Sequence, residues 1–251
     1  MLNRQARMDV MESGIAIHSI WYTIQGEGPH IGTPAVFVRL YGCNLQCPLC
    51  DTDYTSPERL KTFESSHQAF HHIRAEAAKL TENLKLQSPP LIVFTGGEPF
   101  RQYEFPHLCA LLMDAAYPIQ IETNGSLFPH GQTYAFMDLP ACSIVVSPKR
   151  QVDDQWFDES LSNRSFRVYY KYLIQRGKVD PIDGLPVGVL GYQIKVRRPP
   201  AFARAQGHVM VQPVDVHDNA ENELNVQACV TVAMQHGYRY TPQLHKALGL
   251  P

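Results

Sequence analysis

Three cysteines lie within eight residues of this 251-residue chain. Cys43, Cys47 and Cys50 are separated by three and two residues, so their thiolates can converge on one inorganic centre. A structural zinc site would need a fourth ligand, whereas a four-iron cluster held by three cysteines leaves one iron open to bind a substrate or cofactor. The conceivable zinc donors are His67, His71 and His72. The spacing therefore favours an iron–sulfur centre, with a zinc loop as the alternative.

The other three cysteines stand alone in the sequence, at Cys109, Cys142 and Cys229. A disulfide framework would need cysteines distributed along a short secreted chain, which this pattern does not provide. We therefore expect these three to be small core residues.

A second polar motif is Thr95-Gly96-Gly97-Glu98-Pro99, which follows a short apolar run. The glycines let the backbone approach a ligand closely, and the Glu98 carboxylate can accept a hydrogen bond from an ammonium group. The motif is thus a candidate for holding a small charged molecule beside the cysteine loop.

The composition limits the partners of the chain. With 22 Lys and Arg against 24 Asp and Glu, the net charge of −2 gives no overall basic field for nucleic acid. No run approaches the roughly 18 apolar residues of a membrane-spanning helix, and Met1–Ser13 lacks the uninterrupted apolar segment of a secretion signal. We therefore expect a soluble, cytoplasmic protein without nucleic-acid or membrane partners.

Apolar periodicity predicts the elements that position these motifs. An alternating β-branched and aromatic run at Ala35–Tyr41 predicts a strand ending two residues before Cys43. Further strands are expected at Leu91–Thr95, Ile119–Glu122, Ser143–Ser147, Val168–Ile174 and Val209–Val214. Helices are expected at Ser66–Leu86, with a serine N-cap, and at Tyr103–Ala116 and Ala220–His236.

Six strands alternating with helices, with polar motifs at strand ends, predict a parallel α/β sheet whose site lies at the carboxyl edge. Eight repeats would close a TIM barrel, so about six βα units predict an incomplete one. The stretch Arg176–Gln206 is rich in Gly and Pro and fits the repeat poorly, so we expect an excursion or extra hairpin there. We expect a single domain over residues 1–251.

The cysteine spacing, directly after a first barrel-like strand, resembles that of the radical S-adenosylmethionine (SAM) enzymes. The resemblance implies a 4Fe–4S cluster held by Cys43, Cys47 and Cys50. The open iron would bind the amino and carboxylate groups of SAM and deliver one electron, producing a 5'-deoxyadenosyl radical. The Gly-Gly-Glu turn is similar to the methionine-binding motif of these enzymes.

Residues not needed for a cluster narrow the resemblance to the 7-carboxy-7-deazaguanine synthases. They are Ile24-Gln25-Gly26-Glu27-Gly28, Arg39, Thr52, Glu122-Thr123-Asn124-Gly125, Ser147-Pro148-Lys149, Gln212-Pro213-Val214-Asp215 and the terminal Leu248-Gly249-Leu250-Pro251. The resemblance covers residues 15–251 but is thin over Pro57–Ser88 and Arg176–Gln206. It implies a carbon–nitrogen lyase that contracts the ring of 6-carboxy-5,6,7,8-tetrahydropterin with loss of ammonia, on the path to 7-deazapurines such as queuosine.

The resemblance also implies roles for individual residues. Substrate contacts are expected from Ile24, Gln25, Gly26, Glu27, Arg39, Thr95 and Pro251. SAM or other cofactor contacts are expected from Asp51, Gly97, Glu98, Ser147, Lys149, Gln212, Pro213, Val214 and Asp215. Thr52 would bind Mg²⁺ together with the substrate carboxylate. No protein residue is assigned as the hydrogen abstractor, because the reactive species belongs to the cofactors.

Ordinary structural roles remain open for several of these residues. Arg39 could form a surface ion pair, Thr52 a local turn or cap, and Lys149 a solvated loop. Gln25 and Glu27 could belong to a polar turn. The alternative activities are another small radical SAM enzyme, such as a glycyl-radical activating enzyme, and a zinc-stabilised interaction module. An external electron donor such as flavodoxin and a homodimer are implied by the resemblance alone.

Overall fold

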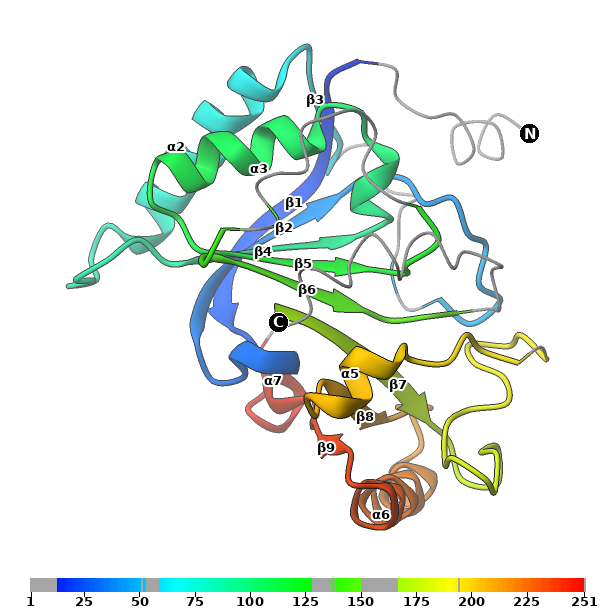
Figure 1. The fold of residues 1–251 in the computed structure, drawn as a ribbon. Coiled ribbons are helices and arrows are strands. Elements are labelled where there is room, and N and C mark those ends of the chain that lie inside the picture. The colour runs from blue at the N-terminus through cyan, green and yellow to red at the C-terminus, as the bar shows by residue number, and fades with distance from the viewer. Residues whose placement is uncertain are drawn as a thin grey trace.

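The computed structural model describes residues 13–50, 52, 59–127, 137, 139–149, 167–193 and 195–250. Within these residues the strands form one sheet in the order β3-β1-β2-β4-β5-β6-β7-β8-β9 (Figure 1). The strands are β1 Ile15–Ile24, β2 Pro34–Leu40, β3 Lys61–Phe63, β4 Leu91–Gly96, β5 Ile119–Thr123, β6 Cys142–Val146, β7 Val168–Ile174, β8 Val209–Pro213 and β9 Arg239–Tyr240. The helices are α2 Ser66–Thr81, α3 Phe105–Asp114, α5 Ala201–Ala205, α6 Asn219–His236 and α7 Leu244–Ala247, with short 3-10 turns η1 Gly28–His30 and η3 Pro99–Arg101.

The six predicted strands are confirmed as β2, β4, β5, β6, β7 and β8, and all of them pair in parallel. The incomplete parallel barrel is therefore the correct fold class. The sequence reasoning missed β1, which pairs antiparallel with β2 along most of its length and with β3 at its start. It also missed the two-residue β9, which extends the parallel part beyond β8. Strands β3 and β1 lie at one end of the sheet and β9 at the other, and none of them follows the strand-helix repeat.

The predicted helices are present with shifted ends. Ser65 caps α2, since its side chain accepts a hydrogen bond from the Gln68 backbone N–H. The helix ends at Thr81, five residues before the expected Leu86, because Leu84 and Leu86 remain exposed and add no core contact to extend it. Helix α6 begins after an Asp218 cap and ends at His236, where Gly237 caps it in the left-handed conformation with a φ of +68°.

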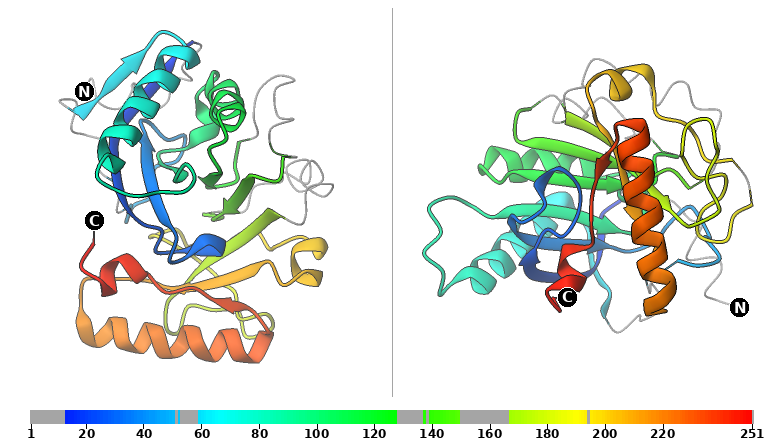
Figure 2. Two further views of the ribbon diagram at one scale, coloured as in Figure 1. Left: turned by 90° about the vertical axis from the view of Figure 1, so that its left-hand side faces the viewer. Right: turned by 90° about the horizontal axis from the view of Figure 1, so that it is seen from below.

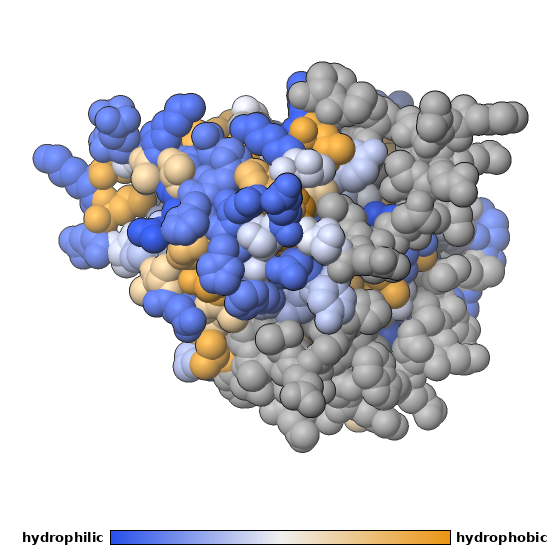
Figure 3. Space-filling model, turned by 90° about the horizontal axis from the view of Figure 1, so that it is seen from above, coloured by the Kyte–Doolittle hydropathy of each residue, from blue (hydrophilic) through white to orange (hydrophobic). Residues whose placement is uncertain are grey.

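The two faces of the sheet differ in chemistry. Helices α2 and α3 cover the first half of the sheet and α6 lies against its last strands (Figures 1 and 2). The face toward these helices carries the main apolar core, including Val38, Phe94, Ile121, Val146, Tyr170 and Val211. The helix layer in turn presents a largely hydrophilic outer surface with scattered apolar residues (Figure 3). The helix-facing side of the sheet is thus a conventional core.

The opposite, inner face is polar toward the carboxyl ends of the strands. Residues in register across a parallel sheet share a face, and Arg39 is in register with Thr95. The same face continues through Glu122 and Lys171 to Gln212, which lies beside Leu173. A row of polar side chains therefore lines the inside of the incomplete barrel.

The Arg176–Gln206 stretch is irregular. Among its described residues an isolated antiparallel bridge joins Val179 and Pro186 before the short helix α5. None of the helices in the described ranges is long and apolar enough to cross a membrane.

Candidate functional site

The cysteine loop leaves β2 at the carboxyl edge of the sheet. Cys43 and Cys47 are partly buried, Cys50 is exposed, and all three are free thiols. They are close enough that the charge of one affects the others. Burial raises the pKa of Cys43 to about 11 and also raises the pKa of Cys47, so these two thiols are neutral until a metal centre displaces their protons. Three neighbouring free thiols fit as the protein ligands of a cluster with one open iron.

The Glu98 turn packs directly against the start of this loop. The Gly97 N–H donates to the Leu40 carbonyl at 3.1 Å, and the Glu98 N–H donates to the Gly42 carbonyl at 2.9 Å. A Cβ at position 97 would lie 1.6 Å from that same Gly42 oxygen, so only glycine fits there. The two motifs that the sequence singled out thus form one structural unit.

The Glu98 carboxylate is fully buried among neutral donors. It accepts hydrogen bonds from the Thr123 hydroxyl at 2.7 Å and the Asn124 N–H at 2.8 Å. Burial raises the pKa of Glu98 to about 7, although these bonds and the charge of Lys149 act in the opposite direction. A ligand cation would complete this environment, because it would stabilise the ionised carboxylate.

The turn after β5 joins Glu98 to the cysteine loop from the other side. The Asn124 side-chain amide donates to the side-chain oxygen Oδ1 of Asn44 at 3.1 Å and lies 3.9 Å from the Cys43 sulfur. Asn44 in turn donates to the Ser126 hydroxyl at 2.8 Å. The cysteine loop is therefore held by the ends of the next two parallel strands, β4 and β5.

On the inner face, Glu27 is the centre of a second polar cluster. Lys171 forms an ion pair with its carboxylate, and the Gln212 and Gln243 amides donate to it at 2.8 and 3.2 Å. Burial disfavours the charge on Glu27, but Lys171 and the two amides outweigh it and lower the pKa to about 2. Glu27 is therefore ionised at neutral pH and already paired with a protein cation.

Glu122 links the remaining polar residues of the inner face. Its carboxylate accepts from the Gln25 amide at 3.2 Å, the Thr95 hydroxyl at 2.9 Å and the Gln120 amide at 3.1 Å. The Gln25 side-chain oxygen also accepts a hydrogen bond from the Glu27 backbone N–H at 3.0 Å. The network fixes Gln25 and Thr95 in position without using all of their hydrogen-bonding groups.

Arg39 lies beside this network with its guanidinium stacked on the Trp21 ring, 5.0 Å from the ring centroid. Its Nε is buried and has no hydrogen-bond partner among the described residues. The stack fixes the planar fork while leaving donors for an anion. The alternative of an exposed surface ion pair does not describe this side chain, which is partly buried on the inner face.

The C-terminal segment packs over the Gln25–Gly28 turn. The Leu244 N–H donates to the Gly26 carbonyl at 3.0 Å, and a Cβ at Gly26 would lie 2.2 Å from the His245 ring. The Gly28 N–H donates to the Thr241 hydroxyl at 3.0 Å. The segment is described up to Leu250, so Pro251 itself lies outside the described residues, as does Asp51.

Other predicted site residues are placed as follows. Lys149 donates to the Ser147 hydroxyl at 2.7 Å, and its charge acts on both Cys47 and Glu98, so it faces the cysteine loop. Asp215 instead accepts from Lys246, Asn222 and the His217 N–H, which ties the end of β8 to α6 and α7. These contacts lower the pKa of Asp215, so its carboxylate serves the protein's own packing. Ile24, Pro213 and Val214 lie at the ends of β1 and β8.

Sequence reasoning missed several residues of the site. Lys171 is a lone charge in the otherwise apolar and aromatic strand β7, and that contrast was a usable signal. Arg101 follows the Glu98 turn and is buried with its guanidinium against Gly42, where a Cβ would lie 2.2 Å from it. Gln243 gave no signal, because its partner Glu27 is 216 residues away in the sequence. Thr123 belongs to the Glu122–Gly125 motif, but its hydrogen bond to Glu98 could not be read from the sequence.

The histidines considered as zinc donors have other contacts. His67 packs on the His107 ring, His71 on Phe70 and His72 on Phe63. Their rings therefore belong to the α2 layer. The solitary cysteines are confirmed as core residues, since Cys109, Cys142 and Cys229 are all buried.

Comparison with known proteins agrees with this geometry. The model of the Radical SAM superfamily matches residues 37–142, which include the cysteine loop and the Glu98 turn. The chain is similar to a 7-carboxy-7-deazaguanine synthase from Rhodospirillum rubrum, with 36% identity over 92% of this chain and 91% of the relative. One from Rickettsia prowazekii is 33% identical over 94% and 88%. The crystal structure of QueE from Escherichia coli shares the fold, with a TM-score of 0.59, 22% identity and coverage of 92% and 95%. This chain belongs to the 7-carboxy-7-deazaguanine synthase family of radical SAM enzymes.

Proposed function

We propose that the chain converts 6-carboxy-5,6,7,8-tetrahydropterin to 7-carboxy-7-deazaguanine by radical ring contraction with loss of ammonia. The observation that carries the proposal is the joining of the cysteine loop to the Glu98 turn at the mouth of a polar inner face. Family membership supplies the cofactor class, a 4Fe–4S cluster with SAM. When bound, these cofactors supply one-electron chemistry that removes a substrate hydrogen atom.

In this proposal the strand edge holds the cofactors. Cys43, Cys47 and Cys50 bind three irons of the cluster. Glu98, buried and hydrogen-bonded to neutral donors, accepts the ammonium group of SAM, and Gly97 lets the backbone approach it. Ser147 and Lys149 line the same edge, and the Lys149 charge suits a carboxylate or a ligand sulfur.

The inner face receives the substrate. Arg39 offers a fixed guanidinium fork to the pterin carboxylate, supported by its stack on Trp21 and its unpartnered Nε. The ionised Glu27 and the amide of Gln25 present acceptors and donors to the edge of a flat heterocycle. Thr95, held by the hydrogen bond of its hydroxyl to Glu122, lies between the residues that hold the cofactors and those that receive the substrate. The protein's contribution is to position the pterin and exclude water.

Further elements of the proposal depend on the family resemblance. Thr52 binds Mg²⁺ with the substrate carboxylate and waters, since magnesium prefers oxygen ligands. Pro251 brings the chain terminus to the pterin, which the packing of Leu244 on Gly26 supports. The proposal also includes a one-electron donor such as flavodoxin, which reduces the cluster. The chain is a single domain that acts as a homodimer in the cytoplasm, and its product leads to queuosine.

The test is anaerobic incubation of the reconstituted protein with SAM, a reductant, Mg²⁺ and the carboxypterin. Mass analysis should show a product that differs from the substrate by one ammonia, formed only when Mg²⁺ is present. A colourless, iron-free preparation would instead support a zinc module. Hydrogen transfer to a polypeptide without turnover of the pterin would support a glycyl-radical activating enzyme.

A further inference from the structure

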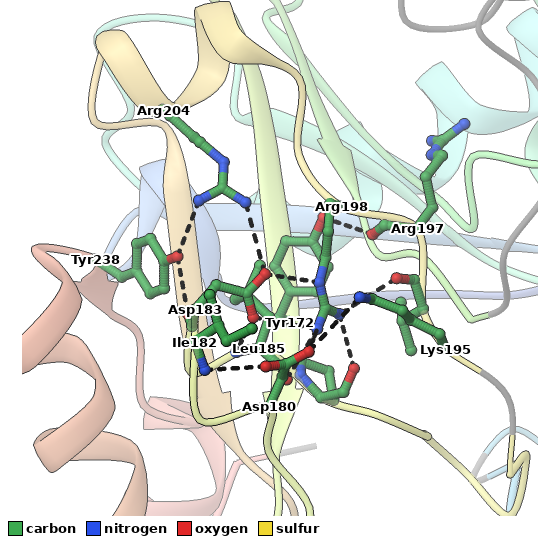
Figure 4. A network of polar contacts seen from close by, with 12 residues as sticks. Tyr172, Asp180, Ile182, Asp183, Leu185, Lys195, Arg197, Arg198, Arg204 and Tyr238 are labelled. Atoms are coloured by element: carbon green, nitrogen blue, oxygen red, sulfur yellow. Dashed lines mark hydrogen bonds and ion pairs between the residues drawn. The ribbon is translucent and has the colours of Figure 1, made fainter.

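Two segments outside the strand-helix repeat contact the site, and they are held in different ways. The excursion before α5 is fixed by Arg198, which forms ion pairs with Asp183 at 2.8 Å and with Asp180 at 3.4 Å (Figure 4). These three side chains are less than one fifth exposed. The Leu190–Tyr192 turn of the excursion reaches the cysteine loop, where the Leu49 N–H donates to the Leu190 carbonyl at 3.1 Å. The excursion is therefore anchored by largely buried charges.

The second segment comprises residues 242–250, which we call the C-terminal strap. Thr241 before it is buried, its N–H donates to the Val211 carbonyl at 2.9 Å, and its hydroxyl accepts from the Gly28 N–H at 3.0 Å. Pro242 has no N–H, so the bonding to the sheet ends at Thr241. No residue of the strap is buried. Since segments with little apolar burial open at a low cost in free energy, the strap depends on its polar contacts.

The strap closes the open side of the incomplete barrel. The described strands run from β3 and β1 at one end of the sheet to β9 at the other, and the two ends are not paired with each other. The Leu244 N–H of the strap donates to the Gly26 carbonyl at 3.0 Å, and the Gln243 amide donates to the Glu27 carboxylate at 3.2 Å. Helix α7 accordingly lies next to the chain that follows β1 (Figure 1). The strap thus covers the turn that is proposed to contact the substrate.

A buried acceptor beside Glu27 points to a ligand behind the strap. Gln212 is 1% exposed, and its amide donates to the same Glu27 oxygen that Gln243 binds. The Gln212 side-chain oxygen Oε1 has no hydrogen-bond partner among the described residues. Buried acceptors in native proteins are normally bonded, so a donor from a ligand is expected at this place. Because the proposed cofactors occupy the strand edge, an opening at the strap would admit the pterin to an enzyme that already holds SAM.

Asp215 is arranged to receive the strap. Its Oδ1 accepts from the Asn222 amide at 2.7 Å and from the His217 N–H at 2.8 Å. His217 has a φ of +58°, a left-handed conformation that a non-glycine residue keeps only where its contacts impose it. The other oxygen, Oδ2, pairs with Lys246 of the strap, whose side chain is 42% exposed. Exposed ion pairs contribute little to stability, so this pair can break without loss of the fold.

We propose that residues 242–250 form a strap that opens to admit the pterin, and that Lys246 is a positioning residue that holds the strap closed through Asp215. In the closed state the strap places Gln243 on Glu27 and so fixes a carboxylate that contacts the substrate. The inference rests on the proposed function, because it takes Glu27 as a substrate contact. It also assigns the Asp215 carboxylate to the closure of the strap.

The first experiment measures hydrogen exchange of the reconstituted full-length protein by mass spectrometry. Strap amides should exchange faster than those of β8, and saturating 6-carboxy-5,6,7,8-tetrahydropterin should slow them. Lys246→Met should speed strap exchange about two- to fivefold, as expected from loss of an exposed ion pair, and Lys246→Arg should restore the wild-type rate. Lys79→Met, on an exposed lysine of α2, is the matched control. Strap amides as protected as those of β8, or equal exchange in Lys246→Met and wild type, would overturn the proposal.

The second experiment separates a positioning role from a general loss of structure. Stopped-flow measurements on the SAM-loaded enzyme without reductant should show that the pterin dissociates about two- to fivefold faster from Lys246→Met, with SAM affinity unchanged. An unchanged dissociation rate, or an equal loss of SAM affinity, would refute the role of Lys246. A wild-type enzyme that holds its cluster but binds no pterin would refute the proposed function instead, while strap exchange without pterin would still decide whether Lys246 holds the strap.

Discussion

Glu98 beside the cysteine loop and Glu27 on the inner face are both carboxylates removed from water, yet their surroundings differ. Neutral donors surround Glu98, and burial raises its pKa to about 7. Glu27 is paired with Lys171 and has a pKa of about 2. The charge of Lys149 only partly offsets the burial of Glu98, so a ligand cation would stabilise the ionised carboxylate, whereas Glu27 is already neutralised and offers hydrogen bonds of fixed geometry. The contrast suits cofactor capture at the strand edge and recognition of a neutral heterocycle on the inner face.

The largest effect is expected at the cysteine loop. Cys43→Ala should abolish cluster retention and SAM cleavage, because two thiolates do not hold a cluster that needs three. Iron analysis and chromatography for the SAM cleavage product measure both losses. Cys109→Ala, a core cysteine, is the control and should keep its iron. Retention of full SAM cleavage in Cys43→Ala would remove this residue from the ligand set.

Breaking the Glu27–Lys171 ion pair on the inner face should have the next largest effect. Lys171→Met leaves the Glu27 charge unpaired and should lower the free energy of unfolding by about 3–5 kcal/mol. Urea unfolding of the metal-free protein measures the loss. Adding Glu27→Gln should recover most of it, since the stranded charge is then removed. A double variant no more stable than the single one would show that Lys171 acts through packing alone.

At the strand edge, removal of the Glu98 charge should weaken the binding of SAM. Glu98→Gln keeps the shape but loses a charge-assisted hydrogen bond, so SAM affinity of the loaded enzyme should fall about 10- to 100-fold. Equilibrium binding of SAM measures the change. Glu104→Gln, whose carboxylate accepts from Ser66 in the helix layer, should leave SAM affinity unchanged.

The same variant tests the raised pKa of Glu98. A folded-state pKa of about 7 against the ordinary 4.5 means that the folded protein holds an extra proton between these values. The stabilising effect of that proton is complete below pH 4.5 and is lost as the pH rises through about 7. The stability of metal-free Glu98→Gln relative to wild type should therefore increase from pH 5 to pH 8. A constant difference would contradict the raised pKa.

A smaller effect is expected from Arg39→Lys. The ammonium keeps the charge but loses the planar fork and its stack on Trp21, so pterin affinity should fall about tenfold. SAM affinity should stay unchanged, and binding titrations with each ligand separate the two. Equal losses for SAM and pterin would count against a carboxylate-binding role on the inner face.

The smallest effect is expected from a substitution on the helix-covered side of the sheet. Ser65→Ala removes the N-cap of α2 and should cost about 1 kcal/mol in the free energy of unfolding. The affinities for SAM and pterin should not change, because α2 contributes no residue to the site. A change in either affinity would show that the two faces of the sheet are coupled.

The sequence predicted the parallel core well because its strands are short apolar runs bounded by turn residues. It failed at β1, which lies outside the strand-helix repeat, and at the end of α2, where apolar periodicity continues into exposed residues. The cysteine trio and Glu98 were identified because they are local motifs. Lys171 and Glu27 are 144 residues apart, so no local pattern could reveal their pairing.

The sequence by itself determined which chemical groups stand at the strand ends: three thiols, a glutamate turn and a set of amide and guanidinium side chains. The tertiary structure alone decided the pKa values of these groups and the distant residues that contact them. A pKa depends on the water removed and the partners supplied by distant segments, which is why two similar glutamates differ so widely. The contact of the Leu190–Tyr192 turn with the cysteine loop exists only once β7 and β2 are set in one sheet.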